Sequence, residues 1–177
     1  LLSTKDQRQL RLMETLIQHR NWMKLHELAE KLGCTERILK SDLNELRIAF
    51  PSINIQSSVN GIMIDLEVNT SVEDVYQYFL ANSQSFQLLE YMFFNEGLPI
   101  YRTIENLHSS NANLYRLGRN ITKVLSSQFQ IELSFTPSEI RGNEIDIRYF
   151  FAQYFSERYY FLDWPFLDIP EIGRAHV

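Results

Sequence analysis

The feature that most constrains this chain is a pair of leucine-rich helical patterns joined by a single glycine. Leucines recur at helical spacing over residues 25–32 and again over 36–50, which predicts two amphipathic helices. Gly33 follows the first helix as a left-handed C-cap residue would, and Thr35 is placed to cap the second. Because Ala29 offers a small residue where the two helices cross, the pair predicts a helix-turn-helix.

The residues on either side of this pair extend the pattern to a whole domain. A predicted helix over 6–19 precedes it, with its apolar residues on one face. After Pro51, isoleucines alternate with polar residues on both sides of Asn60-Gly61, which predicts a two-stranded hairpin. Three helices followed by a hairpin predict a winged helix-turn-helix domain, which we place at residues 1–68.

The second helix of the pair also predicts which side chains a partner would meet. Its leucines face the core, so the residues between them point outward. Arg matches the guanine edge in the major groove, while Lys and the polar hairpin side chains suit phosphate. The predicted DNA contacts of this domain are Thr35, Arg37, Ile38, Lys40, Ser41 and Asn44 on the helix and Ser57, Ser58 and Asn60 on the hairpin. A winged-helix protein-interaction module without direct DNA reading remains the alternative.

The same order of patterns recurs about 75 residues later and predicts a second winged helix-turn-helix domain over 69–141. Helical patterns cover residues 70–80, 85–94, 100–107 and 110–125, and an alternating strand pattern covers 129–135. Aligning Ser110 with Thr35 places His108 where Gly33 stands. The same alignment places Gly118 at the position of Leu43, so the tightness of this turn is open.

The outward residues of this second domain are rich in amides, which suit adenine edges. The predicted DNA contacts here are Asn111, Asn113, Tyr115, Arg116, Arg119 and Asn120. Asn-rich helix starts are also common capping chemistry, and that alternative remains open.

The charge distribution limits how strongly this chain is expected to bind a nucleic acid. The formal net charge is −5, which argues against strong non-specific binding to phosphate. Residues 1–66 nevertheless hold nine Lys and Arg against eight Asp and Glu, so the first predicted domain is the least acidic part. We therefore expect binding with a modest salt dependence, or binding that needs several protomers.

Composition and motifs argue against other function classes. The sequence has no Gly-rich phosphate loop, nucleophile elbow or zinc-protease motif, so we expect no enzymatic activity. Cys34 and four scattered histidines form no metal-binding pattern, so we expect neither metal nor cofactor, and we interpret Cys34 as a small apolar residue. The chain lacks an 18-residue apolar run and a signal-peptide pattern, which predicts a cytoplasmic protein without membrane contact.

Residues 142–177 predict the start of a third, helical domain. A helical pattern after Gly142 carries many aromatic residues on a broad face, which we interpret as core. Because this face is larger than the following residues can cover, we expect a longer protein, or packing on a second chain. The predicted fold class is therefore mainly α with short β wings: two tandem winged helix-turn-helix domains followed by the beginning of a further helical domain.

Taken in this order, the motifs resemble the Mga family of virulence-gene regulators of Gram-positive cocci. The strings that carry the resemblance are residues 34–37, 93–97, 114–116, 142–144 and 147–151, with Trp164-Pro165. The resemblance implies a transcription activator whose paired helix-turn-helix domains bind promoter DNA. It also implies regulatory domains similar to those controlled by the sugar phosphotransferase system, with phosphotransferase proteins as partners and homo-oligomers formed through domains beyond this chain. Antiterminators share related regulatory domains but bind RNA through a different small domain, so RNA is the less favoured partner.

Overall fold

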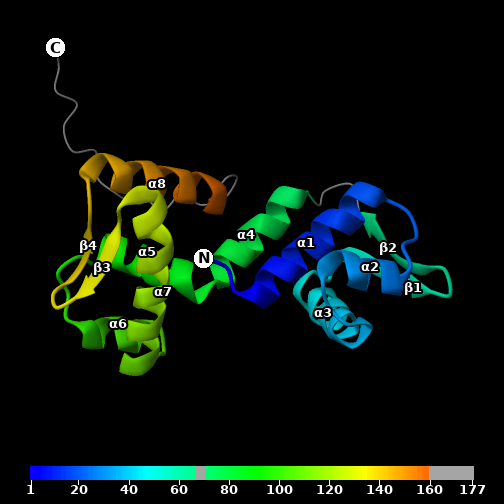
Figure 1. The fold of residues 1–177 in the computed structure, drawn as a ribbon, viewed down its shortest axis with the longest axis horizontal. Helices are drawn as coiled ribbons and strands as arrows, with labels where there is room; N and C mark the ends of the chain where they lie inside the picture. The colour runs from blue at the N-terminus through cyan, green and yellow to red at the C-terminus, as the bar shows by residue number, and fades with distance from the viewer. Residues whose placement is uncertain (67–70, 160–177) are drawn as a thin grey trace, which may run out of the picture. The chain divides into compact units, whose positions relative to one another are not determined.

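The computed structural model describes residues 1–66 and 71–159, which form helices and two separate two-stranded antiparallel sheets (Figure 1). The chain divides into two compact units, which are Leu1–Phe86 and the residues from Gln87 onward. Every helix in the described ranges is too short or too polar to span a lipid bilayer. The same ranges hold no group of three or more His, Cys, Asp or Glu side chains arranged to bind a metal ion.

Helices α1 (Thr4–His19), α2 (Leu25–Leu32) and α3 (Glu36–Ala49) confirm the three predicted helices of the first unit. Their caps are also as expected, because Gly33 ends α2 in the left-handed conformation and the Thr35 hydroxyl accepts a hydrogen bond from the Ile38 amide. The leucine faces meet in one core. Its most deeply buried members from the three helices are Leu12, Met13, Leu16, Leu28, Leu39, Leu43 and Leu46.

A hairpin of β1 (Ile53–Ser58) and β2 (Gly61–Leu66) follows, but its turn lies one residue earlier than the sequence suggests. The loop consists of Val59 and Asn60, and Gly61 is the first residue of β2. A Cβ atom on Gly61 would lie 2.0 Å from the Met23 carbonyl oxygen. Met23 and Ile62 exchange two backbone hydrogen bonds of 2.8 Å at this point. The glycine is therefore needed for the close approach of Met23 to β2.

Helix α4 (Val72–Asn82) packs with the first unit. The Ser71 and Asp74 side chains form a reciprocal capping box at its start. Val75 and Phe79 join the core built by α1 to α3. The predicted domain bounds at 68/69 and 141/142 stay predictions.

The second unit contains α6 (Ile100–Asn106), α7 (Asn111–Phe129), β3 (Glu132–Phe135), β4 (Ser138–Arg141) and α8 (Glu144–Arg158). Helix α5 (Gln84–Phe94) crosses the division between the units. The strand predicted to begin at Phe129 is wrong at its start, because Phe129 is the last residue of α7. Its ring lies 5.4 Å from the ring of Phe150, centroid to centroid, so packing on α8 accounts for this aromatic residue.

The aromatic face of α8 is core, as predicted. Phe151 lies 4.4 Å from Phe93 of α5, centroid to centroid, and the Tyr154 hydroxyl donates a 2.6 Å hydrogen bond to the Glu90 carboxylate. Tyr159 also donates to Glu90. Burial raises the pKa of both phenols, with a smaller contribution from Glu90, and the pKa of Tyr159 reaches about 12. Residues 160–177, where the predicted third domain continues, lie outside the described part of the chain.

Candidate nucleic-acid interface

Helix α3 separates an inner leucine face from an outer polar face. Leu39, Leu43 and Leu46 are at most 2% exposed. The predicted contact residues of this helix lie on the other face and are all exposed to solvent: Thr35, Arg37, Ile38, Lys40, Ser41 and Asn44. Arg37 and Lys40 make no hydrogen bond or ion pair with any other residue that the structure describes. Two cationic side chains of this face are therefore available to an external anion.

A buried acidic residue fixes α3 against α1. Asp42 is 2% exposed and accepts hydrogen bonds from Arg8 Nε at 2.6 Å and Arg8 Nη2 at 3.1 Å. Gln9 Nε2 donates to the same carboxylate at 3.1 Å. A paired arginine fork of this kind defines orientation as well as position. Asp42 therefore holds the helix so that its outer face stays exposed.

Glu45, one turn further along α3, is also engaged by α1. Lys5 Nζ lies 2.5 Å from Glu45 Oε2, and Gln9 Nε2 donates to the same oxygen at 2.9 Å. The Lys5 hydrogen bond, followed by that of Gln9, lowers the pKa of Glu45, and the pKa of Lys5 is raised in return. Both partners are about half exposed, so solvent screens this pair.

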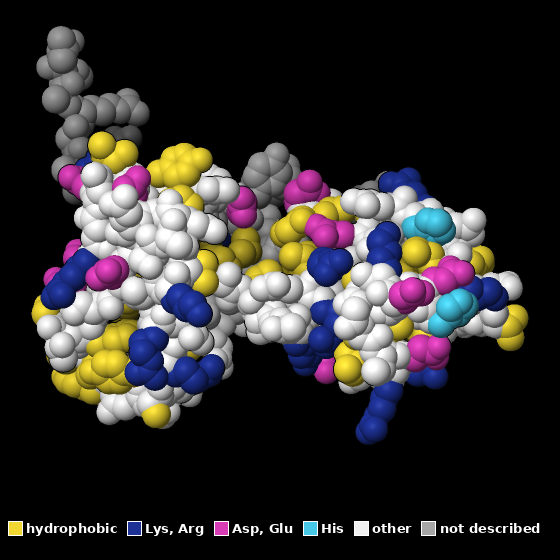
Figure 2. Space-filling model, viewed as in Figure 1, with side chains coloured by type: hydrophobic (Ala, Val, Ile, Leu, Met, Phe, Trp, Pro, Cys, Tyr) yellow, Lys and Arg dark blue, Asp and Glu magenta, His cyan; other side chains and the backbone are white. Residues whose placement is uncertain are grey.

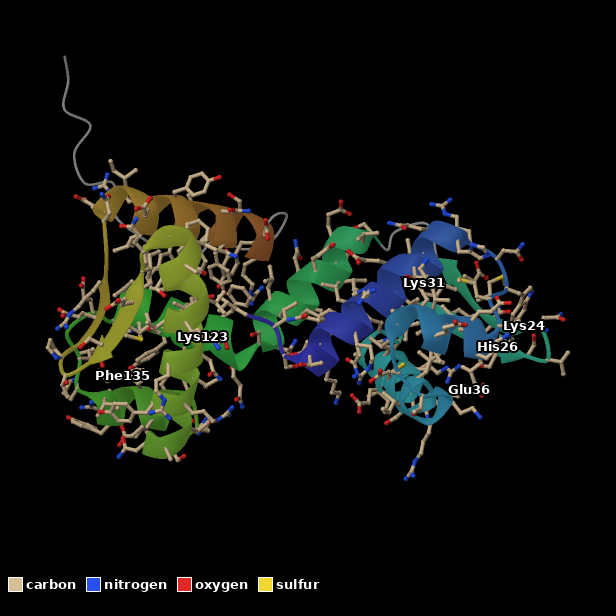
Figure 3. The ribbon with its side chains drawn as sticks, in the orientation of Figure 1. Lys24, His26, Lys31, Glu36, Lys123 and Phe135 are labelled. Atoms are coloured by element: carbon tan, nitrogen blue, oxygen red, sulfur yellow. The ribbon has the colours of Figure 1, made fainter. Side chains whose placement is uncertain are left out.

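The hairpin presents its predicted contact residues at its exposed end. Ser57, Ser58 and Asn60 are exposed, and the Ser58 hydroxyl accepts a 3.0 Å hydrogen bond from the Asn60 amide. Lys24 Nζ donates to the Val59 carbonyl oxygen at 3.1 Å, so a cation accompanies the hairpin loop (Figure 3). No local sequence pattern indicates a role for Lys24, because it precedes α2 and contacts the loop only in the folded chain.

Arg47 near the end of α3 is the second residue that sequence reasoning missed. Its guanidinium donates from Nε to the Ile55 carbonyl oxygen at 3.1 Å, from Nη1 to Asn44 Oδ1 at 3.1 Å, and from Nη2 to Ser57 Oγ at 2.5 Å. Two predicted contact residues from separate elements, Asn44 and Ser57, are thus brought together on one side chain. The spacing of Asn44 and Arg47 could have indicated their pairing, but the strand partners could not be read from local sequence.

The turn between α6 and α7 repeats the turn between α2 and α3. The amide of Cys34 donates to the Ala29 carbonyl at 3.0 Å, and the amide of Ser109 donates to the Ile104 carbonyl at 3.0 Å. Ser110 then caps α7 by accepting from the Asn113 amide, as Thr35 caps α3. The backbone geometry of the two turns therefore agrees despite the difference in side chains.

The outer face of α7 is less available than that of α3. Of its six predicted contact residues, Asn113 is half-buried and Tyr115 is 40% exposed. The other four are exposed: Asn111, Arg116, Arg119 and Asn120. Asn113 donates to Ser109 Oγ at 2.9 Å and accepts from Arg116 Nη2 at 2.7 Å. The Tyr115 ring packs 5.2 Å from that of Phe135. Half of the predicted residues therefore have partners within their own unit.

Basic and acidic side chains are interspersed over the first unit in the view of Figure 2. Lys24, His26, Lys31 and Glu36, labelled in Figure 3, show this mixture around α2 and the start of α3. Within the described ranges, the outer face of α3 thus presents two cations without partners, Arg37 and Lys40, with both acidic and basic side chains around them. Chemically this arrangement can take up a few phosphates beside base-edge contacts, with a modest salt dependence.

Comparisons with known proteins agree with this geometry. A family model described as "M protein trans-acting positive regulator (MGA) HTH domain" matches residues 3–62. A second, described as "Mga helix-turn-helix domain", matches residues 68–155. The two matches together extend from α1 into α8.

Two relatives match almost the whole chain. A protein of Streptococcus pneumoniae serotype 4, named "Putative trans-acting regulator", is 50% identical over 166 residues, covering 94% of this chain. The "Capsule synthesis positive regulator AcpA" of Bacillus anthracis is 25% identical over 170 residues, covering 93% of this chain. The chain spans 34% of the length of each relative. With both helix-turn-helix models matched in order, the chain belongs to the Mga family of trans-acting regulators.

Proposed function

We propose that this chain is the DNA-binding part of a transcriptional regulator, and that α3 enters the major groove of double-stranded promoter DNA. The observation that carries the proposal concerns Arg37 and Lys40, which are exposed and have no hydrogen-bond or ion-pair partner among residues 1–66 and 71–159. The opposite face of the same helix is buried in the core. The major groove of B-DNA admits one α-helix, and side chains near the start of such a helix reach base edges. Arg37 is proposed to read a base, while Lys40 neutralises phosphate.

The hairpin β1–β2 is proposed to act as a wing on the adjacent DNA backbone. Its exposed hydroxyls and amide, Ser57, Ser58 and Asn60, are suited to phosphate oxygens. Lys24 adds a charge at the same loop. The remaining proposed contacts on α3, Thr35, Ile38, Ser41 and Asn44, lie on its exposed face.

A second winged helix-turn-helix in the second unit is proposed to bind a neighbouring stretch of the same duplex. The matching turn geometry and the exposed Arg116 and Arg119 support this role. Asn111, Asn113, Tyr115 and Asn120 complete its proposed contact set. Two tandem modules would suit half-sites roughly 10 base pairs apart, one turn of the double helix.

The names of the relatives support further proposals about the complete protein. Both are called regulators, and the Bacillus anthracis protein is called a positive regulator, so we propose a cytoplasmic activator without enzymatic activity. A helical regulatory domain that begins at residue 142, with phosphotransferase proteins and a second protomer as partners, remains a proposal from the family resemblance.

Fluorescence anisotropy with labelled duplexes tests DNA binding directly. A pool of labelled random-sequence duplexes is titrated with the 177-residue chain at about 50 mM and about 200 mM salt. In a parallel selection, the duplexes that the chain binds are separated from the pool and sequenced. We expect binding at low salt that weakens at high salt, and enrichment of a defined sequence. Absence of binding at low salt would leave the protein-interaction function, and binding without enrichment would refute base reading by Arg37.

Charge reversal locates the contact surface in the same assay. Arg37→Glu should abolish binding because it places a carboxylate in the negatively charged major groove, where Arg37 is proposed to contact a base edge. Arg11→Glu, on the exposed face of α1, is the matched control and should bind like the parent. Equal loss in both variants would show that only overall charge matters.

A further inference from the structure

The outer edge of β1 faces the end of α3, and one side chain joins them. The sheet order is β1–β2, and Met23 lies on the far side of β2, so β1 is an edge strand. An edge strand exposes backbone groups that need partners. Arg47 donates to one of these, the Ile55 carbonyl oxygen, at 3.1 Å, and to the Ser57 hydroxyl two residues on at 2.5 Å.

The second unit has a contact of the same kind at the corresponding position. Aligning Ser110 with Thr35 places Thr122 of α7 where Arg47 stands in α3. The Thr122 hydroxyl accepts a 3.0 Å hydrogen bond from the amide of Leu133 in β3. Both hairpins are therefore joined to the preceding helix through the same helical position, with the direction of the hydrogen bond reversed.

We propose that Arg47 is a positioning residue that fixes the wing against the recognition helix, and that Thr122 does the same in the second unit. The proposal rests on the proposed DNA-binding function. Arg47 has no need to touch DNA for this role, since it acts through Ser57 on the wing and Asn44 on the helix. A rigid wing lowers the entropic cost of binding two DNA elements at once.

The substitution Arg47→Lys separates positioning from simple charge. Lysine keeps the positive charge, but its single ammonium group cannot reach three acceptors in the planar geometry of a guanidinium. A residue that only neutralises a phosphate would tolerate lysine. A residue that holds the wing would not.

Spin-label distances measure the wing directly and need no DNA. Ile48 on α3 and Val59 on the hairpin loop are 82% and 93% exposed, so cysteines at these positions accept labels, in a background where Cys34 is replaced by Ser. We expect a narrow distance distribution in the parent and a clearly broader one in Arg47→Lys. Arg11→Lys is the matched control and should leave the distribution narrow. An unchanged distribution in Arg47→Lys overturns the proposal.

A measurement of DNA affinity tests whether fixing the wing matters for binding. Losing the multiple hydrogen bonds of Arg47 should weaken binding about tenfold in Arg47→Lys, with an unchanged salt slope. Full affinity together with a loosened wing would overturn the positioning role. If the parent binds no DNA, the proposed function fails, and the distance measurement still decides whether Arg47 holds the wing.

The second unit offers a test that does not involve charge. Thr122→Val removes the acceptor, so the Leu133 amide should exchange with solvent at least several times faster by NMR, while Thr122→Ser should restore the protection. Equal exchange in the parent and in Thr122→Val would remove the second unit from the proposal. Circular dichroism of every variant checks that the helices remain folded.

Discussion

Gly33 and His108 hold the same left-handed backbone conformation at corresponding positions of two helix-turn-helix turns, with φ angles of +66° and +47°. The Gly33 amide donates to the Glu30 carbonyl at 3.1 Å, and the His108 amide donates to the Glu105 carbonyl at 3.3 Å. A residue with a Cβ atom is disfavoured in this conformation by about 1–2 kcal/mol. One unit therefore makes the turn with the residue that fits it, and the other makes it under strain.

Exchanging the residue type at these turns should shift stability in opposite directions. His108→Gly should stabilise the second unit by about 1 kcal/mol, and Gly33→Ala should destabilise the first by a similar amount. A Cβ atom at Gly33 meets nothing within 4 Å, so the backbone alone sets the cost. Urea unfolding measures both changes, and a neutral Gly33→Ala would contradict this explanation of the turn.

Alanine substitution on α3 should distinguish base reading from phosphate binding. Arg37→Ala should cost roughly 1–3 kcal/mol of binding free energy and relax the selected DNA sequence. Lys40→Ala should weaken all sequences alike and reduce the salt slope by about one. Anisotropy titrations over a series of salt concentrations measure both effects. Parent-like affinity in both variants would remove the proposed contact face.

The contact between Gly118 and Phe135 predicts a packing defect on enlargement. A Cβ atom on Gly118 would lie 2.5 Å from Phe135 Cε2, so Gly118→Ala should cost about 1–3 kcal/mol of unfolding free energy. The substitution Phe135→Leu replaces the ring by a smaller side chain and should make room for the added methyl group. A double-mutant cycle by thermal unfolding checks this: the combined variant should lose less than the sum of the two single losses, and strict additivity would refute the contact.

The reactivity of Cys34 should follow its partial burial. Burial raises the pKa of this thiol, because the thiolate loses hydration, while the Arg8 charge opposes the shift to a smaller extent. Its alkylation by iodoacetamide should therefore be slower at neutral pH than that of a free cysteine peptide, and the rate should rise only at higher pH. In urea the two rates should become equal. A peptide-like rate in the folded chain would show an exposed thiol instead.

The helices of the first unit were predictable because their signals are local. The leucine spacing, the cap at Thr35 and the glycine at residue 33 all act within a few residues along the chain. The hairpin was predictable for the same reason, but its turn was misplaced. Gly61 is required at the start of β2 because Met23, distant in sequence, approaches its backbone, and its φ of +117° also favours glycine.

The exposed face of the candidate site followed from the same periodicity, whereas its internal connections did not. The positions of Arg37 and Lys40 need only the helical repeat. The contacts of Arg47 and Lys24 depend on where the hairpin folds back, which no local pattern specifies. Phe129 fits an alternating strand pattern because it stands two residues before Ile131, but its spacing from Leu125 also suits a helix, and it lies in α7.

The ion pairs of α1 with Asp42 and Glu45 change the electrostatic potential that α3 presents to solvent. This helix carries three acidic residues, and two of them are paired with cations of α1: Asp42 with Arg8 and Glu45 with Lys5, while Gln9 donates hydrogen bonds to both. An approaching polyanion would therefore meet the fields of Arg37 and Lys40 with only Glu36 to oppose them on this helix. A weakly acidic protein can in this way keep one locally attractive surface, and a formal charge count of −5 understates its capacity for phosphate.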